Sequence, residues 1–190
     1  MNDMIKNAGF IFMKVGTHAQ ESIEDIVKRK QREFEETGSI FWGYGGNTCH
    51  PLTMVQPFAK EIEGSGNQLL IVMQKMDSKH AAPPAIAKQY SDDGVNWQPI
   101  PKGIEVRGSR YALVLDELKI NEFELDLCEL EVGVGRSRGR KANEYLMGRV
   151  DKGCFCYKPE TGSVPRDEKL VKPIDLVARV KQPYAVFLKN

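Results

Sequence analysis

The chain has 190 residues, 41% of them hydrophobic, and its 27 Lys and Arg against 26 Asp and Glu leave a formal net charge of +1. This length suits a single globular domain over 1–190 that buries a full core, and the charge excludes binding of nucleic acid through a global basic field. No stretch approaches the roughly 18 apolar residues of a membrane span, and the N-terminus lacks the pattern of a secretory signal, so we expect a cytoplasmic protein with no membrane partner.

The first forty residues predict a strand followed by a long helix. Residues 9–15 form an apolar run of aromatic and branched side chains, which is typical of a strand buried on both faces. Gly16 ends the run, and Thr17-His18-Ala19-Gln20 matches a capping box at a helix start. Apolar residues at helical spacing continue to Gly38, a typical terminator, so we expect a long helix that begins at Thr17.

The next part of the chain is less regular. Three glycines, an Asn and a Pro interrupt the aromatic residues of 39–53, which predicts a structured loop rather than a helix or an unbroken strand. A short helix at 56–63 and a buried strand at 68–74 follow. Prolines and an Asp-Asp-Gly sequence then mark turns and edge structure over 77–103.

The second half predicts strands and one short helix. Period-2 alternation over 123–128 indicates a half-exposed strand, and a short helix is expected at 142–147, closed by Gly148. Other strands are expected at 104–106, 111–115, 149–152 with 154–157, 176–180 and 184–188. The sum is an α+β fold: a single mixed, mainly antiparallel sheet with one long N-terminal helix and one or two short helices.

The first candidate site is a basic, glycine-rich segment at 133–149. Its part from 136 to 149 has a net charge of +4, whereas 116–131 has a net charge of −6. Glycines let a backbone approach an anion closely, and arginine forks match phosphate oxygens, so we expect an anion site. The alternative is a solvated loop that pairs with the acidic segment. The candidate ligand-binding residues are Arg136, Ser137, Arg138, Arg140, Lys141 and Arg149.

The second candidate site is the aromatic, glycine-rich loop 41–51. Trp42 and Tyr44 supply flat surfaces on which a base could stack, while Asn47 and His50 can hydrogen-bond the edges of a base, a ribose or a phosphate. The alternative is that the aromatic residues anchor a tight turn in the core. A third candidate is the predicted helix start, where Thr17, His18 and free amides suit a phosphate, although the capping box by itself accounts for Thr17.

Metal and nucleophile chemistry have little support in the sequence. The four cysteines are too few for a disulfide scaffold, and the spacing of Cys154 and Cys156 suits alternate positions of a strand better than a zinc site. No motif pairs a serine or cysteine nucleophile with an oriented base. We therefore expect reduced thiols, no metal, no cofactor and no catalytic residue.

These observations favour a protein that binds a nucleotide or another phosphorylated small ligand without turnover, as a sensor or sponge of a signal that could be a cyclic dinucleotide. A homodimer with facing pockets would suit a two-fold ligand. One alternative is an enzyme on a nucleotide or nucleic acid that uses His50 or His18 as acid or base. Another is a reader of single-stranded or modified nucleic acid that stacks an extruded base on Trp42. The leading interpretation assumes that loops 41–51 and 133–149 form one pocket.

Overall fold

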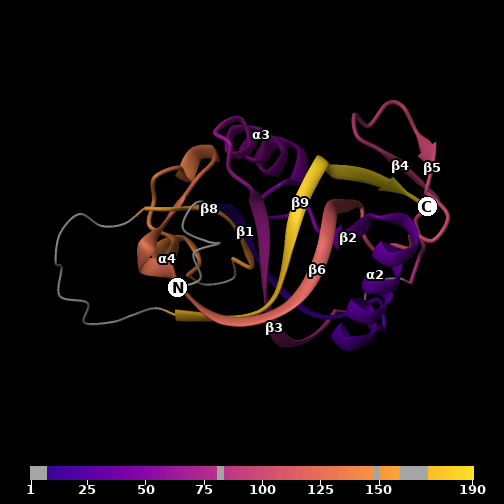
Figure 1. The fold of residues 1–190 in the computed structure, drawn as a ribbon, viewed down its shortest axis with the longest axis horizontal. Coiled ribbons are helices and arrows are strands. Elements are labelled where there is room, and N and C mark those ends of the chain that lie inside the picture. The colour runs from indigo at the N-terminus through magenta and orange to yellow at the C-terminus, as the bar shows by residue number, and fades with distance from the viewer. Residues whose placement is uncertain (1–7, 81–83, 148–149, 159–170) are drawn as a thin grey trace.

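The computed structural model describes residues 8–80, 84–147, 150–158 and 171–190 (Figure 1). Within these ranges one large, mainly antiparallel sheet carries a few helices, which confirms the α+β class. The strand order is β2-β6-β9-β3-β1-β8-β7, and β4 adds to β9 and pairs with β5. The strands are β1 Gly9–His18, β2 Ile40–Tyr44, β3 Leu69–His80, β4 Gln89–Ser91, β5 Gln98–Pro99, β6 Tyr111–Asp126, β7 Leu130–Val132, β8 Lys152–Tyr157 and β9 Val171–Lys189.

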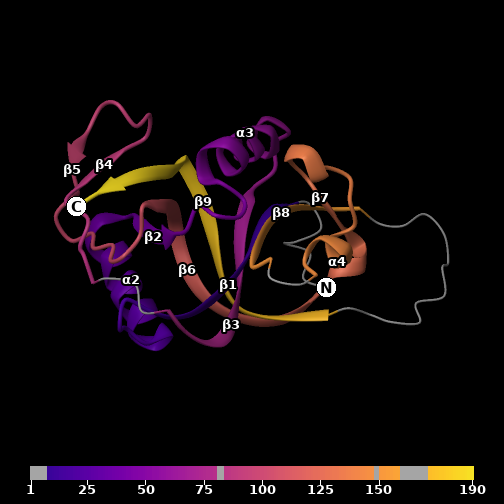
Figure 2. The ribbon, with the colours of Figure 1, turned by 180° about the vertical axis from the view of Figure 1, so that it is seen from behind.

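The helices lie at separate places around the curved sheet. In Figure 1, α2 lies at the end that also holds β2, α4 lies at the opposite end, and α3 lies between them; Figure 2 shows the same order from behind. The α-helices are α2 Ile23–Thr37, α3 Gln56–Gly64 and α4 Ala142–Tyr145. Shorter turns are the π-helix η1 Pro51–Val55 and the 3-10 helices η2 Leu127–Glu129 and η3 Gly135–Ser137. No helix among the described residues is long and apolar enough to cross a membrane.

The central strand β1 is buried on both faces, as its apolar run predicts. It pairs in parallel with β3, Ile11 opposite Ile71, and antiparallel with β8, Ile11 opposite Cys154. Because successive side chains of a strand point to opposite faces, Ile11 joins the core cluster under α2 and α3, while Phe10 and Phe12 join the cluster beside α4. Strand alternation therefore divides one apolar run between two cores.

The predicted long N-terminal helix is not seen, because its predicted start is wrong. β1 continues through Gly16 and Thr17 to His18, because pairing with β3 extends to the His18–His80 register. A tight turn with Ala19 and Gln20 at positive φ follows, and the helix begins at Ile23, where the Ser22 side chain accepts a hydrogen bond from the Asp25 amide. The result is a helix of 15 residues that ends, as predicted, at the left-handed Gly38.

Other boundaries differ where strand pairing outweighs local composition. Residues 40–44 form the regular strand β2 on β6, although 39–53 read as a loop. Residues 104–106 form no strand, yet Ile104 and Val106 are buried in a third core cluster with residues of β6 and β9. The two predicted C-terminal strands are one strand, β9. The predicted helix at 142–147 is reduced to the four residues of α4, and its expected terminator Gly148 lies outside the described residues.

Candidate functional site

The two aromatic residues expected to stack a base are core residues. Trp42 is 4% exposed and Tyr44 is fully buried, because β2 pairs along its whole length with β6. The Tyr44 hydroxyl donates to the Cys49 carbonyl at 2.9 Å, and the Lys152 ammonium lies 5.5 Å from the Tyr44 ring centre. Neither ring offers a free face, so the interpretation of both as stacking surfaces is wrong. Of the remaining polar residues of this loop, Asn47 is exposed and His50 is half-buried.

The basic segment lies on the surface and its arginines are partly engaged with carboxylates. Arg138 pairs with Glu61 of α3, and Arg140 pairs with Glu144 of α4 at 3.7 Å. The backbone of Lys141 forms an isolated antiparallel β-bridge with that of Glu131. Arg136 and Ser137 belong to η3, with the arginine exposed, and Arg149 lies outside the described residues. Arg138 and Arg140 therefore pair with carboxylates of the neighbouring helices α3 and α4 rather than with the acidic segment 116–131.

Loop 41–51 and the basic segment lie in the same part of the fold, but they contact different residues there. The loop that follows β2 lies on the β8 side, where Thr48 donates to Asp151 at 2.6 Å and the sulfurs of Cys49 and Cys154 are 3.2 Å apart. The basic segment lies beside η1 and α3, where a Cβ atom on Gly135 would meet Met54 at 3.2 Å. The described arginines contact Glu61 and Glu144 rather than loop 41–51, so a single pocket made from both loops stays a prediction.

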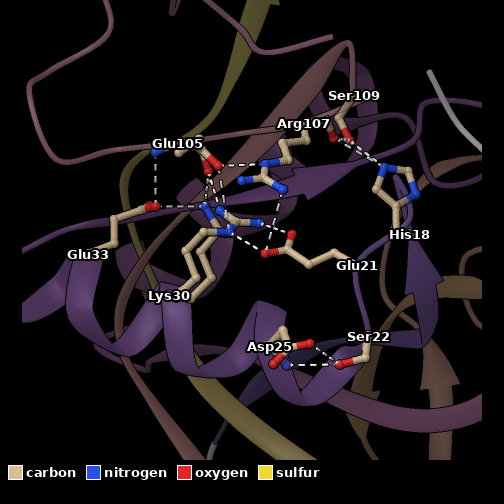
Figure 3. A network of polar contacts seen from close by, with 10 residues as sticks. His18, Glu21, Ser22, Asp25, Lys30, Glu33, Glu105, Arg107 and Ser109 are labelled. Carbon is tan, nitrogen blue, oxygen red and sulfur yellow. Dashed lines mark hydrogen bonds and ion pairs between the residues drawn. The ribbon is translucent and has the colours of Figure 1, made fainter. Parts of the chain in front are cut away.

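The third candidate, Thr17 and His18, lies at the end of β1 beside a polar network (Figure 3). His18 Nε2 is 3.2 Å from the Arg107 carbonyl oxygen and 3.5 Å from Ser109 Oγ. A carbonyl oxygen only accepts, so Nε2 carries the proton in this contact and cannot take one from Ser109. The geometry therefore does not make His18 a general base for that hydroxyl.

The same network holds two buried opposite charges. Lys30 and Glu33 of α2 are each 2% exposed and form an ion pair at 2.8 Å. Glu33 also accepts the amides of Phe41 and Glu105, while Lys30 donates to the Glu105 carbonyl at 2.6 Å. Burial lowers the pKa of Lys30 to about 8. Figure 3 shows that these contacts connect the loop before β6 to α2. Because each buried charge has several partners, the network holds this loop against the helix.

At the border of the network the Glu21 carboxylate receives two hydrogen bonds from Arg29, at 2.8 and 2.6 Å. This hydrogen bonding from Arg29 lowers the pKa of Glu21. Such a paired arginine fork is already satisfied by a carboxylate and is poorly placed to receive a phosphate. The expectation of a phosphate at Thr17 and His18 therefore gains no support from the neighbouring cations.

A row of four half-buried rings lies elsewhere, along the ends of β6 and β9. The ring centres of His50 and Tyr111 are 5.1 Å apart, those of Tyr111 and Phe187 are 5.6 Å apart, and those of Phe187 and Trp97 are 6.5 Å apart. The Lys189 ammonium is 5.4 Å from the Trp97 ring centre. We call these four residues the aromatic row. Tyr111 and Phe187 are paired in register across β6 and β9, which explains why residues far apart in sequence meet here.

His50 is oriented by its own position at the start of η1. Its Nδ1 accepts the Leu52 amide at 3.3 Å, and its Nε2 lies 3.2 Å from the Tyr111 hydroxyl oxygen. Because Nδ1 accepts, Nε2 carries the proton of the neutral ring and donates to Tyr111. The hydroxyl proton of Tyr111 is then available to donate to a ligand. His50 in this state orients Tyr111 and has no vacant nitrogen for base catalysis.

A cleft of about 470 Å³ opens between α3, the loop after β4 and the bend of β9, and none of the four residues of the aromatic row lines it. Gln56, one of its wall residues, donates to the Ala185 carbonyl at 2.9 Å, two positions before Phe187. On the other wall, Asp92 lies two positions before Gly94, whose missing side chain leaves room for the Phe187 ring at 2.8 Å from the Cβ position. The cleft is lined by Gln56, Lys60, Glu63, Gly64, Asp92, Gln182, Pro183 and Tyr184.

Of the twelve residues proposed from the sequence, only His50 belongs to the aromatic row. Tyr111, Phe187 and Trp97 were missed. One available signal was Trp97 itself, because it follows a polar, turn-rich segment, residues 91–96, in which Val95 is the one apolar side chain. Among the described residues no group of three or more His, Cys, Asp or Glu could hold a metal ion, and Cys154 and Cys156 occupy alternate positions of β8 as predicted.

No protein-family model, curated protein or solved structure matches this chain.

Proposed function

We propose that the protein binds a small ligand with a planar ring, of which a nucleotide is the class best suited, in the cleft and along the aromatic row, and releases it unchanged. The observation that carries the proposal is the aromatic row itself. Partly exposed rings that lie in a row in space are the kind of surface on which bases stack in sequence-tolerant binding sites. A sensor or a sponge needs this binding and no chemistry.

The polar groups around the row suit the remaining parts of a nucleotide. The Tyr111 hydroxyl can donate to a ring acceptor, and the amide oxygens of Gln56 and Gln182 are potential acceptors at the cleft. The Gln56 amide hydrogens are taken by the Pro183 and Ala185 carbonyls, whereas Gln182 keeps one beside its hydrogen bond to Glu63. Two cations flank the site: Lys60 in the cleft, for which the described residues offer no ion-pair partner, and Lys189 at the Trp97 end. These cations support a phosphorylated ligand, while Glu63 and Asp92 disfavour a highly charged one near the cleft.

The test is a thermal-shift panel of nucleosides, mono- and dinucleotides and cyclic dinucleotides. A ligand at 100 times its Kd adds about 2.7 kcal/mol, or roughly 5 to 10 °C for a chain of this size. The ligand is then released by heat and identified by chromatography. Recovery of the intact ligand supports binding without turnover, whereas recovery of a product would show an enzyme. No shift with any of these compounds would refute the proposal.

The row is tested by Trp97→Ala, with Val95→Ala as the matched control. Val95 belongs to the same loop and is 76% exposed, so its truncation should leave affinity unchanged. Loss of one stacking ring should weaken binding about 5- to 150-fold, since stacking contributes about 1–3 kcal/mol per base. Equal affinity of the two variants would place the ligand elsewhere. A double Arg136→Ala, Arg138→Ala variant then asks whether the ligand is held at the basic segment instead.

Two further measurements test alternatives that the sequence analysis left open: binding of single-stranded nucleic acid, and a homodimer that shares a two-fold ligand. A small ligand with one or two phosphate contacts gives a shallow dependence of affinity on salt, whereas single-stranded nucleic acid gives a steep one. Sedimentation with and without a cyclic dinucleotide shows whether two protomers share a two-fold ligand.

A further inference from the structure

Two cysteines from distant parts of the chain meet in the core between the loop after β2 and strand β8. The sulfurs of Cys49 and Cys154 are 3.2 Å apart, although the residues are 105 positions apart. Cys154 lies in the middle of β8, opposite Ile11 of β1, and Cys49 has a positive φ of 50°. A non-glycine residue rarely adopts this backbone conformation, so the surrounding fold must hold Cys49 there.

The pair has a polar environment on one side. Lys152, 6% exposed, is bonded to Asp151 at 2.9 Å, and Asp151 accepts from Thr48, the residue before Cys49. The thiol of Cys154 can donate to the sulfur of Cys49, and this hydrogen bond, aided by the charge of Lys152, lowers the pKa of Cys49. Burial raises the pKa of Cys154. Unequal thiols in contact are the arrangement in which one attacks and the other resolves.

We propose that Cys49 and Cys154 are a redox-active dithiol, which a low-molecular-weight disulfide such as oxidised glutathione converts to an intramolecular disulfide. The inference is independent of the proposed ligand binding and goes beyond it. It rests on the contact of the two sulfurs, which must approach from 3.2 Å to the bonding distance of about 2.0 Å.

The exchange proceeds in two balanced steps. Cys49 is 3% exposed, so the loop after β2 must open locally before the Cys49 thiolate attacks one sulfur of the oxidised reagent, which forms a mixed disulfide and expels one reagent thiolate. Cys154, after losing its proton, attacks the Cys49 sulfur, forms the Cys49–Cys154 bond and expels the second reagent thiolate. The protein loses two electrons and two thiol protons, and the reagent is reduced to two thiols.

The matching variant is the double substitution Cys128→Ser, Cys156→Ser, which keeps only the proposed pair of the four cysteines. The folded variant is incubated with glutathione buffers of increasing oxidised fraction, then unfolded and alkylated, and its intact mass is measured. We expect a transition from two alkylated thiols to none, with no glutathione retained. With Cys49→Ser added to this background, Cys154 is the one thiol left, so the variant should form at most a mixed disulfide with glutathione.

Wild-type protein provides a second readout that does not depend on how a variant folds. After oxidation in the folded state, proteolysis without reduction should give a peptide pair joined through Cys49 and Cys154. The proposal is overturned if all four thiols of the oxidised wild type remain alkylatable. It is equally overturned if the bond maps to another pair, or if it forms only in urea, because a buried pair that reacts solely on global unfolding is not redox-active in the native protein.

Discussion

Removal of the Glu33 carboxylate should destabilise the protein more than any other single truncation on α2. Glu33→Ala removes the ion-pair partner of the Lys30 ammonium, which is buried in the contact between α2 and the loop before β6. It also removes the acceptor for the amides of Phe41 and Glu105. The buried cation keeps one carbonyl acceptor, that of Glu105, and two backbone amides lose their side-chain partner.

The magnitude follows from the burial of these groups. Breaking a buried ion pair from one side costs about 3–5 kcal/mol, because the remaining charge stays out of water without its counter-ion. Each orphaned amide adds up to about 1–3 kcal/mol, reduced where water can enter the new cavity. Taking about 4 kcal/mol and a Tm change of about 2–4 °C per kcal/mol, we expect Tm to fall by roughly 8 to 16 °C.

The assay is thermal unfolding followed by circular dichroism, supported by urea titration for the free energy of unfolding. Glu35→Ala is the matched control, because Glu35 lies on the same helix and is exposed. Its Tm should change by no more than about 2 °C, since exposed substitutions stay within about 0.5 kcal/mol. Equal Tm values for the two variants would refute the role of Glu33 as the buried anchor of the network.

Three further predictions concern pH, packing and the redox pair. Burial lowers the pKa of Lys30 from 10.5 to about 8, so the unfolded state binds more protons between these values, and the stability of the wild type should rise from pH 8 to 10.5 relative to Lys30→Met, as measured by urea titration. Gly133→Ala would place its Cβ 2.4 Å from Phe58 and should lower the free energy of unfolding by about 1–3 kcal/mol. A Cβ on Gly64 would meet no atom within 4 Å, so Gly64→Ala should be tolerated, and thermal unfolding of both variants checks the difference. Oxidation of Cys49 and Cys154 closes a long loop and should raise Tm by roughly 5 °C or more over the reduced protein, and an unchanged or lower Tm would show that the bond strains the core.

The sequence alone was informative wherever burial follows a local pattern. The apolar run of β1, the amphipathic body of α2 with its glycine terminator, and the short helix α3 follow from spacing within a few residues. The start of α2 was wrong because Thr17 has a favourable local alternative, a capping box, that loses to pairing of β1 with β3. Local hydrogen bonds and sheet pairing compete for the same amides, and only the fold decides between them.

The site depended on tertiary structure for a different reason. Trp42 and Tyr44 share a loop-like sequence with His50, yet pairing of β2 with β6 buries the first two and leaves the third beside Tyr111. Phe187 and Trp97 join them only because β6, β9 and the hairpin of β4 and β5 converge. The sequence determined which residues could stack, form hydrogen bonds or ionise. Long-range strand register, which no local spacing encodes, decided which of these residues are buried in the core and which lie at the surface.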